Sequence, residues 1–453
     1  MARLTFLGNV HKYSGKELSM DKPTTVLLPK DDLVFPLSQH IGAPAKPLVS
    51  KGDPVLVGQK IGEADGLISS NIISSVSGTV KAIDKRLTAT GRMVESIIVT
   101  DDNEYTKIDG MGQDRDYTKM SDDEIREAVK EAGIVGLGGA GFPTHVKLTP
   151  KDPSKIDYVI VNGAECEPYL TSDYRIMIEE PDKIIHGLKI LLRLFKNAKG
   201  IIAIEDNKPK AIEKIRELIA GESNIEIRVL KSWFPQGGER QLVYATTRRR
   251  LNSKKLPADV GCIVNNVSTV AAIYMAVAKS TPFTHRIITI SGDAIVEPQN
   301  FYVPLGMNFS EILEAAGGLK TQPKKIVFGG PMMGQAMYTY DVPVTKTTST
   351  LLGFIKDEAA VEESPCIRCG RCHTYCTLNL MPNQLHMAGR HNEDEKFLKL
   401  DGMECCGCGC CAYICPANIS LTQTIVQTKQ RIQINKNIDH ELYELHKESV
   451  VNE

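Results

Sequence analysis

The chain has 453 residues, enough for three or more domains that each bury a core of their own. Its 54 Lys and Arg against 55 Asp and Glu give a formal net charge of −1, which argues against a nucleic-acid-binding protein because such proteins present a basic face. No apolar run approaches the length of a membrane span, and the first residues turn polar too soon for a signal peptide. We therefore expect neither a membrane span nor a signal peptide in this chain.

Residues 1–110 are predicted to form an N-terminal β domain. The runs 55–62 and 75–80 are short, rich in β-branched residues and interrupted by glycines, as the strands of a small sandwich are. This segment resembles the biotinyl/lipoyl-like barrel sandwich in its pattern Gly52-Asp53-x-Val55-x-x-Gly58-Gln59, followed by Ser77-Gly78-x-Val80. No lysine matches the one that carries the prosthetic group in that family, so the resemblance implies a structural or docking role.

Residues 115–283 are predicted to form an α/β domain. Ser121-x-x-Glu124 is a capping box at the start of a helix, and Gly133 is expected to end that helix. Strand-like and helix-like segments then alternate, which predicts a largely parallel sheet covered by helices. The expected strands are 158–161, 201–205, 225–230 and 262–264, and the expected helices are 182–195, 209–220 and 270–278.

Residues 284–350 resemble a β-grasp module of the soluble-ligand-binding (SLBB) type. Strands are expected at 286–293 and 302–306, and a helix near 309–316. Both a ligand-binding role and a spacer role are open for this module. An acidic link at 357–364 opens a cysteine-rich, ferredoxin-like domain at 357–420, and a Gln- and Lys-rich tail follows at 421–453.

Eight cysteines in two runs are the most specific feature of the chain. The runs are Cys366-x2-Cys369-x2-Cys372-x3-Cys376 and Cys405-x2-Cys408-x2-Cys411-x3-Cys415-Pro416, the spacing of proteins that carry two [4Fe–4S] clusters. In two-cluster ferredoxins the fourth cysteine of each run ligates the other cluster. We therefore predict two ligand sets. One set is Cys366, Cys369, Cys372 and Cys415, and the other is Cys376, Cys405, Cys408 and Cys411.

Other fates of these thiols are open. Paired C-x2-C can bind structural zinc, and cysteines can form disulfides, although this density without a signal peptide indicates a reducing compartment. The extra thiols Cys406 and Cys410 are interpreted as buried or hydrogen-bonded cysteines beside a cluster, and Cys166 and Cys262 as buried thiols. Because iron–sulfur clusters pass single electrons, the runs predict a redox relay.

A glycine-rich loop at 136–144 follows the capped helix. Its glycines can bring several backbone N–H groups close to a phosphate or a flat ring, although such loops also serve as tight turns. Three more segments, 162–168, 235–242 and 264–267, carry acids, amides or glycines at turns. Each segment taken alone is more often a turn or a helix cap than a site. Ligands of open α/β sheets gather at the carboxyl ends of strands, where these segments are expected, so together they predict a ligand site suited to phosphate, ribose or flavin groups.

The order of these motifs resembles the RnfC family over essentially residues 1–420. The resemblance rests on 39–44 (QHIGAP), 138–144 (GGAGFPT), 162–169 (NGAECEPY), 329–334 (GGPMMG) and both cysteine runs. The central domain is also similar to the flavin subunit of respiratory complex I, which binds FMN and NADH. The chain departs from that subunit at two places. The complex I subunit has arginine where this chain has Leu137, and two acids where this chain has Glu239-Arg240.

The resemblance implies a set of cofactor-binding residues. The implied FMN neighbours are Gly138, Gly139, Lys147, Asn162, Glu165, Glu239, Asn265 and Asn266. The candidates on the nicotinamide side are Phe142, Glu167 and Gly238.

The resemblance also implies an NADH:acceptor oxidoreductase subunit. Hydride passes from NADH to FMN and single electrons continue through two [4Fe–4S] clusters, so no catalytic side chain is predicted. The implied partners are NADH and the other subunits of an ion-translocating ferredoxin:NAD oxidoreductase, at the cytoplasmic face of the membrane. One alternative is a soluble RnfC-like protein that passes NADH electrons to a reductase such as proline reductase. Another is a cluster-bearing scaffold without flavin.

Overall fold

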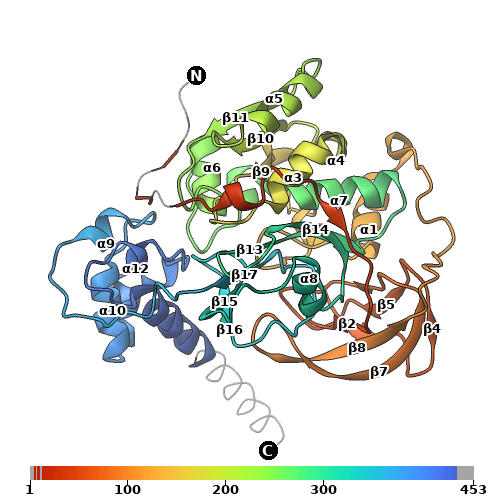
Figure 1. Ribbon diagram of the computed structural model, residues 1–453. Helices are drawn as coiled ribbons and strands as arrows, with labels where there is room; N and C mark the ends of the chain where they lie inside the picture. Colours follow the sequence, from red (N-terminus) through yellow and green to blue (C-terminus); the bar gives the residue numbers. More distant parts are fainter. Residues whose placement is uncertain (1–4, 7, 11–12, 436–453) are drawn as a thin grey trace, which may run out of the picture.

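The structure, a computed structural model, describes residues 5–6, 8–10 and 13–435. Figure 1 shows a β-rich part in orange, a helix-covered sheet in yellow and green, and a teal sheet between them. The cysteine-rich domain, in blue, projects to one side. In the described part of the chain no helix is long and apolar enough to cross a membrane.

The orange part is a sandwich of two antiparallel sheets. One has the order β2 (Leu33–Pro36), β8 (Met93–Asp101), β7 (Gly78–Leu87), β4 (Pro54–Val55), and the other β3 (Lys46–Pro47), β5 (Lys60–Glu63), β6 (Ile72–Ile73). Phe35, Ile61 and Ile72 are fully buried in the core that the sheets share. Alternation of apolar residues along these short strands produces the apolar inner face.

The chain before β2 leaves the sandwich. The 3₁₀ helix η1 (Lys16–Leu18) packs on the central domain, and β1 (Thr25–Val26) pairs in parallel with β14 (Gln299–Pro304) of the teal sheet. The segment predicted to be all-β thus includes a stretch that packs against the central domain and then joins the teal sheet. No local pattern marks this path, because its partners lie more than 100 residues away.

The capping box is confirmed at the start of α1 (Asp122–Glu131). The Ser121 hydroxyl accepts from Glu124 N at 3.2 Å, and Glu124 Oε2 accepts from Ser121 N at 2.6 Å. Gly133, at φ +67°, follows the helix end, and its N–H donates to Lys130 O. The left-handed conformation that glycine adopts easily ends the helix here.

The central sheet is entirely parallel, as predicted. Its strand order is β11 (Ile225–Leu230), β10 (Lys199–Glu205), β9 (Tyr158–Gly163), β12 (Cys262–Asn266). The longer helices of this domain are α3 (Ser172–Glu179), α4 (Pro181–Leu194), α5 (Pro209–Leu218), α6 (Glu239–Thr247) and α7 (Val267–Ala278). Its short helices are η2 (Tyr117–Lys119), α2 (Thr144–Lys147), η3 (Pro153–Lys155) and η4 (Pro257–Val260).

Both faces of this sheet are covered. Val159 and Val161 of β9 join the core that contains Leu188 of α4 and Ile273 of α7. Ile160 faces the other way and packs in a separate cluster with Leu242 and Val243 of α6. Burial on both sides explains the continuous apolar runs of these strands.

The teal sheet mixes parallel and antiparallel pairs. Its order is β1, β14, β13 (His285–Ser291), β17 (Thr350–Phe354), β15 (Lys325–Phe328), β16 (Gln335–Met337), with α8 (Phe309–Ala315) beside it. Strand β17 begins at residue 350, where the predicted module ends, and lies between β13 and β15.

The cysteine-rich domain is helical. It contains α9 (Arg371–Thr374), α10 (Pro382–Arg390), α11 (Asp394–Lys399), η5 (Gly402–Glu404), α12 (Cys410–Tyr413) and a final helix at 421–435. The part of the predicted tail beyond 435 lies outside the described residues. The boundaries of the five predicted domains stay predictions.

Candidate functional site

Two asparagines meet at the carboxyl edge of the central sheet. Asn162 at the end of β9 is in register with Asn266 at the end of β12. The Asn162 amide donates to Gly237 O at 2.9 Å, and its oxygen accepts from Ala164 N at 3.1 Å. Asn162 therefore ties the strand end to the turn at 235–238, which the sequence placed in the same site.

Asn266 is held by a residue that the sequence did not reveal. Its side-chain oxygen caps α7 by accepting from Ser268 N, and its Nδ2 donates to Asp173 Oδ2 at 2.6 Å. Asp173 Oδ1 also accepts from the Ser268 hydroxyl at 2.8 Å. Burial, reinforced by nearby Glu165, raises the pKa of Asp173 to about 6. No motif surrounds Asp173, so no sequence signal pointed to it.

The glycine-rich loop borders this edge. Gly136 N donates to Phe142 O at 2.9 Å and closes the loop, while Leu137 N donates to the Thr269 hydroxyl at 3.0 Å. A Cβ added at Gly138 would lie 2.7 Å from Asn266 Nδ2, but one added at Gly139 would meet nothing within 4 Å. Gly138 therefore permits close packing on Asn266. The surface at Gly139 is open, and we refer to it as the open rim of the site.

Lys147 and Glu239 bring opposite charges to the same edge. Lys147 Nζ, at the end of α2, donates to Val264 O at 2.8 Å and lies 3.8 Å from Glu239 Oε2 at the start of α6. Burial lowers the pKa of Lys147, and the Glu239 carboxylate opposes that shift.

Two buried polar atoms at this edge, on Asn265 and Glu165, have no hydrogen-bond partner among the described residues. Asn265 is 3% exposed and its Nδ2 is unsatisfied, and Glu165 is 5% exposed with Oε2 unsatisfied. The nearest cation to Glu165 Oε2 is Lys16 Nζ, at 3.5 Å. An unsatisfied buried polar group costs about 1–3 kcal/mol, so a bound polar ligand would be favoured here. The unsatisfied amide, the open rim at Gly139 and the charge of Lys147 fit a phosphorylated flavin.

The three residues expected on the nicotinamide side separate in the structure. Phe142 closes the glycine-rich loop, and Gly238 is the N-cap of α6, next to Glu239. The Glu167 carboxylate instead accepts from Met332 N at 3.1 Å and Met333 N at 3.0 Å. It is thus engaged by the loop 329–334 of the teal sheet.

Lys16 is a second residue that sequence reasoning missed. Its buried ammonium donates to Glu167 O at 3.0 Å and to Leu170 O, next to the Glu165 carboxylate. Burial lowers the pKa of Lys16. It pins the N-terminal segment to the loop that follows β9, a contact between residues about 150 apart that no local pattern signals.

The eight predicted ligand cysteines line two separate cavities. One is bordered by Cys366, Cys369, Cys372 and Cys415, and the other by Cys376, Cys405, Cys408 and Cys411. We refer to them as cavity 1 and cavity 2; cavity 2 is also lined by Cys406 and Cys410. The grouping is consistent with the crossed sets, and the ligand roles stay predictions. Among the described residues no three His, Cys, Asp or Glu converge closely enough to hold a single metal ion.

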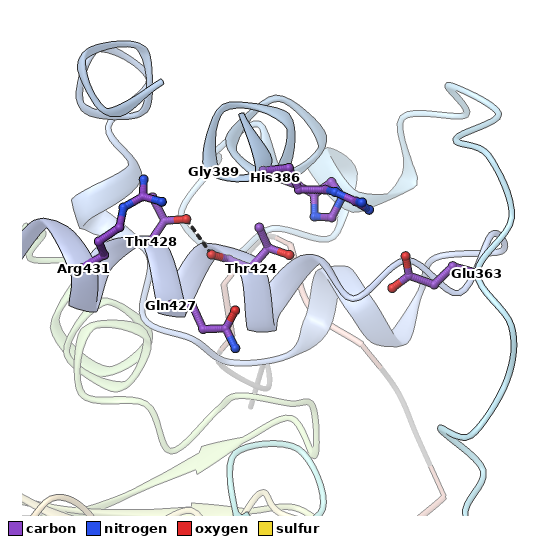
Figure 2. A pocket seen from close by; sticks show the side chains of 8 residues that line it. Glu363, His386, Gly389, Thr424, Gln427, Thr428 and Arg431 are labelled. Carbon is purple, nitrogen blue, oxygen red and sulfur yellow. Dashed lines mark hydrogen bonds between the residues drawn. The ribbon is translucent and has the colours of Figure 1, made fainter. Parts of the chain in front are cut away.

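Another pocket, of about 410 Å³, lies between α10 and the helix 421–435 (Figure 2). Three of its polar side chains are bonded within the protein: the Thr424 and Thr428 hydroxyls donate to helix carbonyls, and Arg431 pairs with Asp394. His386 Nδ1, by contrast, is buried without a hydrogen-bond partner among the described residues. It shares no lining residue with either cysteine cavity.

Family models match three parts of the chain. The RnfC Barrel sandwich hybrid domain matches residues 4–104, the Nuo51 FMN-binding domain 129–275 and the SLBB domain 287–336. These matches confirm the predicted fold of barrel sandwich, flavin domain and β-grasp module. The second also confirms the prediction of FMN.

Curated relatives align with most of the chain. A subunit of the proton-translocating ferredoxin:NAD(+) oxidoreductase complex of Clostridium ljungdahlii is 41% identical over 85% of this chain and 84% of its own length. Its counterpart in the Na(+)-translocating complex of Acetobacterium woodii is 39% identical, over 86% of this chain and 89% of its own. This chain belongs to the RnfC family. Membership confirms the prediction of an oxidoreductase subunit.

Some RnfC-family relatives are longer. The corresponding subunit of the ion-translocating oxidoreductase complex of Haemophilus influenzae is 36% identical. The alignment spans 86% of this chain and 48% of that relative. Among solved structures, an NAD+-reducing [NiFe]-hydrogenase in the H2-reduced state gives a TM-score of 0.48 at 19% identity, over 70% of this chain and 61% of that chain.

Proposed function

We propose that this RnfC-family chain exchanges electrons with NAD(H) as a subunit of an ion-translocating ferredoxin:NAD+ oxidoreductase. The relatives are named as subunits of such complexes. The strongest structural support is that the flavin edge and the two cysteine cavities belong to the same chain. A polar strand edge that fits FMN is joined, in one chain, to two cavities that each contain one of the predicted sets of four ligand cysteines. The proposal includes a peripheral position at the cytoplasmic face of the membrane, beside the other subunits.

The chain's own residues bind and orient the cofactors. Bound FMN would accept a hydride from NADH and release its two electrons singly to the clusters, which is the chemistry the cofactor supplies. The Lys147 ammonium would balance the negative charge of a phosphate, and Asn265 Nδ2 would donate to an oxygen of the ligand. The open rim at Gly139 leaves room for a flat ring, and Phe142 of the same loop and Gly238, beside Glu239, stay our candidates for the nicotinamide side.

The contacts of α6 favour an order for the two clusters. After Glu239 at the flavin edge, Arg240 bonds to Glu404 Oε2 at 2.9 Å and Gln241 to the Thr377 hydroxyl at 2.9 Å. Both partners adjoin ligands of cavity 2. The loop of cavity 1 is exposed, with Ile367 66% accessible. We therefore assign cavity 2 to the flavin side and cavity 1 to the partner protein.

The test is anaerobic purification, followed by iron, sulfide and FMN quantitation and an NADH-bleaching spectrum of the same sample. We expect about eight irons and one FMN per chain, with bleaching by NADH. Clusters without flavin and without a response to NADH would leave the scaffold interpretation instead. Co-purification with membrane subunits, rather than with a soluble reductase, separates the two flavin-containing functions.

Serine substitutions test the two ligand sets. Cys415→Ser should remove the same cluster as Cys366→Ser, and Cys376→Ser the same one as Cys405→Ser, each lowering iron from about eight to about four per chain. Electron paramagnetic resonance of the reduced variants identifies the surviving cluster. The crossed assignment is wrong if Cys415→Ser matches Cys405→Ser.

A further inference from the structure

Cys410 is buried at the contact between the cysteine-rich domain and the flavin domain. It lies between the predicted ligands Cys408 and Cys411 but belongs to neither ligand set. Its side chain is 0% exposed and packs with Val10 and Phe234, and Sγ is 3.9 Å from Phe234 O. Cys410 also lines cavity 2.

Phe234 leads directly into the turn at the flavin edge. It is fixed by two backbone hydrogen bonds to Val10, at 3.0 and 3.1 Å. Three residues later, Gly237 N donates to Cys166 Sγ at 3.4 Å and Gly237 O accepts from Asn162 Nδ2 at 2.9 Å. A short run of packed and bonded groups therefore connects the wall of cavity 2 to the proposed flavin neighbour Asn162.

The first cysteine run provides an internal comparison. The two runs share their spacing, and the short helices α9 and α12 each follow a left-handed glycine, Gly370 or Gly409. The residue that corresponds to Cys410 is Arg371, which is exposed, and the one that corresponds to Cys406 is Ile367. The same position thus faces solvent in one run and packs on the flavin domain in the other.

We propose that Cys410 is a positioning residue that seats the loop of cavity 2 on the turn 235–238. It thereby fixes the separation over which single electrons pass between the flavin edge and the cluster of cavity 2. Because electron-transfer rates fall steeply with separation, a small apolar side chain at this contact maintains the rate. An arginine, as at 371, would place charge and bulk beside Phe234. This inference rests on the proposed function.

The test compares Cys410→Arg with Tyr413→Arg, a substitution at an exposed residue of the same short helix α12 that lines neither cysteine cavity. Stopped-flow mixing with NADH follows flavin and cluster absorbance separately, and hydrogen exchange follows the amides of 233–238. For Cys410→Arg we expect retained iron and FMN, unchanged flavin bleaching, roughly tenfold slower cluster reduction and faster exchange. Tyr413→Arg should match the wild type in all of these measurements.

Cys410→Leu is the milder variant if the arginine disrupts folding, and it should shift cluster reduction and exchange in the same direction by less. Wild-type rates together with wild-type exchange in both Cys410 variants would overturn the inference. Failure of the wild type itself to bleach with NADH would instead overturn the proposed function, and the exchange comparison would still decide whether Cys410 seats the loop.

Discussion

Asp173 has no proposed contact with a cofactor, but it positions Asn266, a residue that is expected to contact FMN. It accepts hydrogen bonds from Asn266 Nδ2 and the Ser268 hydroxyl, and its own N–H donates to Glu165 Oε1 at 2.8 Å. One aspartate therefore fixes two residues of the proposed FMN site. Its raised pKa reflects this crowded, buried position rather than a proton-transfer role.

We predict that Asp173→Ala weakens FMN binding by roughly tenfold to a hundredfold. The Asn266 amide loses a charged acceptor, and hydrogen bonds to charged groups contribute about 1.5–3 kcal/mol. The measurement is fluorescence titration of flavin-depleted protein with FMN. Asp182→Ala, which changes an exposed residue in the first turn of α4, is the control and should bind as the wild type does. Equal affinity in the two variants would remove Asn266 from the flavin site.

At the scale of elements, α6 joins two parts of the molecule. Its first turn presents Glu239 to Lys147 on one side and Arg240 and Gln241 to the cysteine-rich domain on the other. Its buried face packs on β9 and β10 through Leu242 and Val243. A helix held by the sheet core thus fixes the position of the flavin edge relative to cavity 2.

We expect Arg240→Ala to loosen this docking by about 1–2 kcal/mol, since the Arg240–Glu404 pair is mostly shielded from solvent. The acidic link 357–364 should then be cleaved severalfold faster in limited proteolysis, while FMN is retained. Arg250→Ala is the matched control, because it removes an exposed arginine that lies over the Tyr244 ring of the same helix. A cleavage rate equal to that of this control would argue against α6 as the docking element.

Local patterns predicted the elements well, and the contacts between elements poorly. The strand at 225–230 and the capping box at Ser121 depend on neighbours within a few residues, so the sequence displays them. The Glu167 carboxylate, by contrast, was expected near the nicotinamide because its segment follows β9. The structure has it on the amides of Met332 and Met333, at least 165 residues away, and such pairing leaves no local trace.

At the scale of the molecule, a buried lysine joins three domains. Lys346, which follows the teal sheet's α8 in sequence, is 0% exposed and donates to the Ser70 hydroxyl, to Asn71 O and, at 2.8 Å, to Gly133 O. Those acceptors belong to the sandwich and to the end of α1. No carboxylate is among these partners, and burial lowers the pKa of Lys346 to about 7.

We predict a pH-dependent gap in thermal stability between the wild type and Lys346→Met. Below pH 7 lysine is protonated in both the folded and the unfolded state, so its contribution is constant. From about pH 7 to 10.5 the unfolded chain binds more protons, so wild-type stability should rise relative to the variant by up to about 1.4 kcal/mol per pH unit. Melting temperatures of both proteins at pH 7, 8 and 9 check this prediction. A gap that is constant with pH would show that Lys346 stays charged when folded.

The crossed cysteine sets have a consequence for biogenesis. Cavity 2 takes Cys376 from the first run, and cavity 1 takes Cys415 from the second. With these sets, a ribosome that has made only the first run has supplied no complete site, and iron delivered at that stage would meet at most three thiolates of cavity 1. If these cavity linings are the ligand sets, neither cluster can be completed until the second run has emerged from the ribosome.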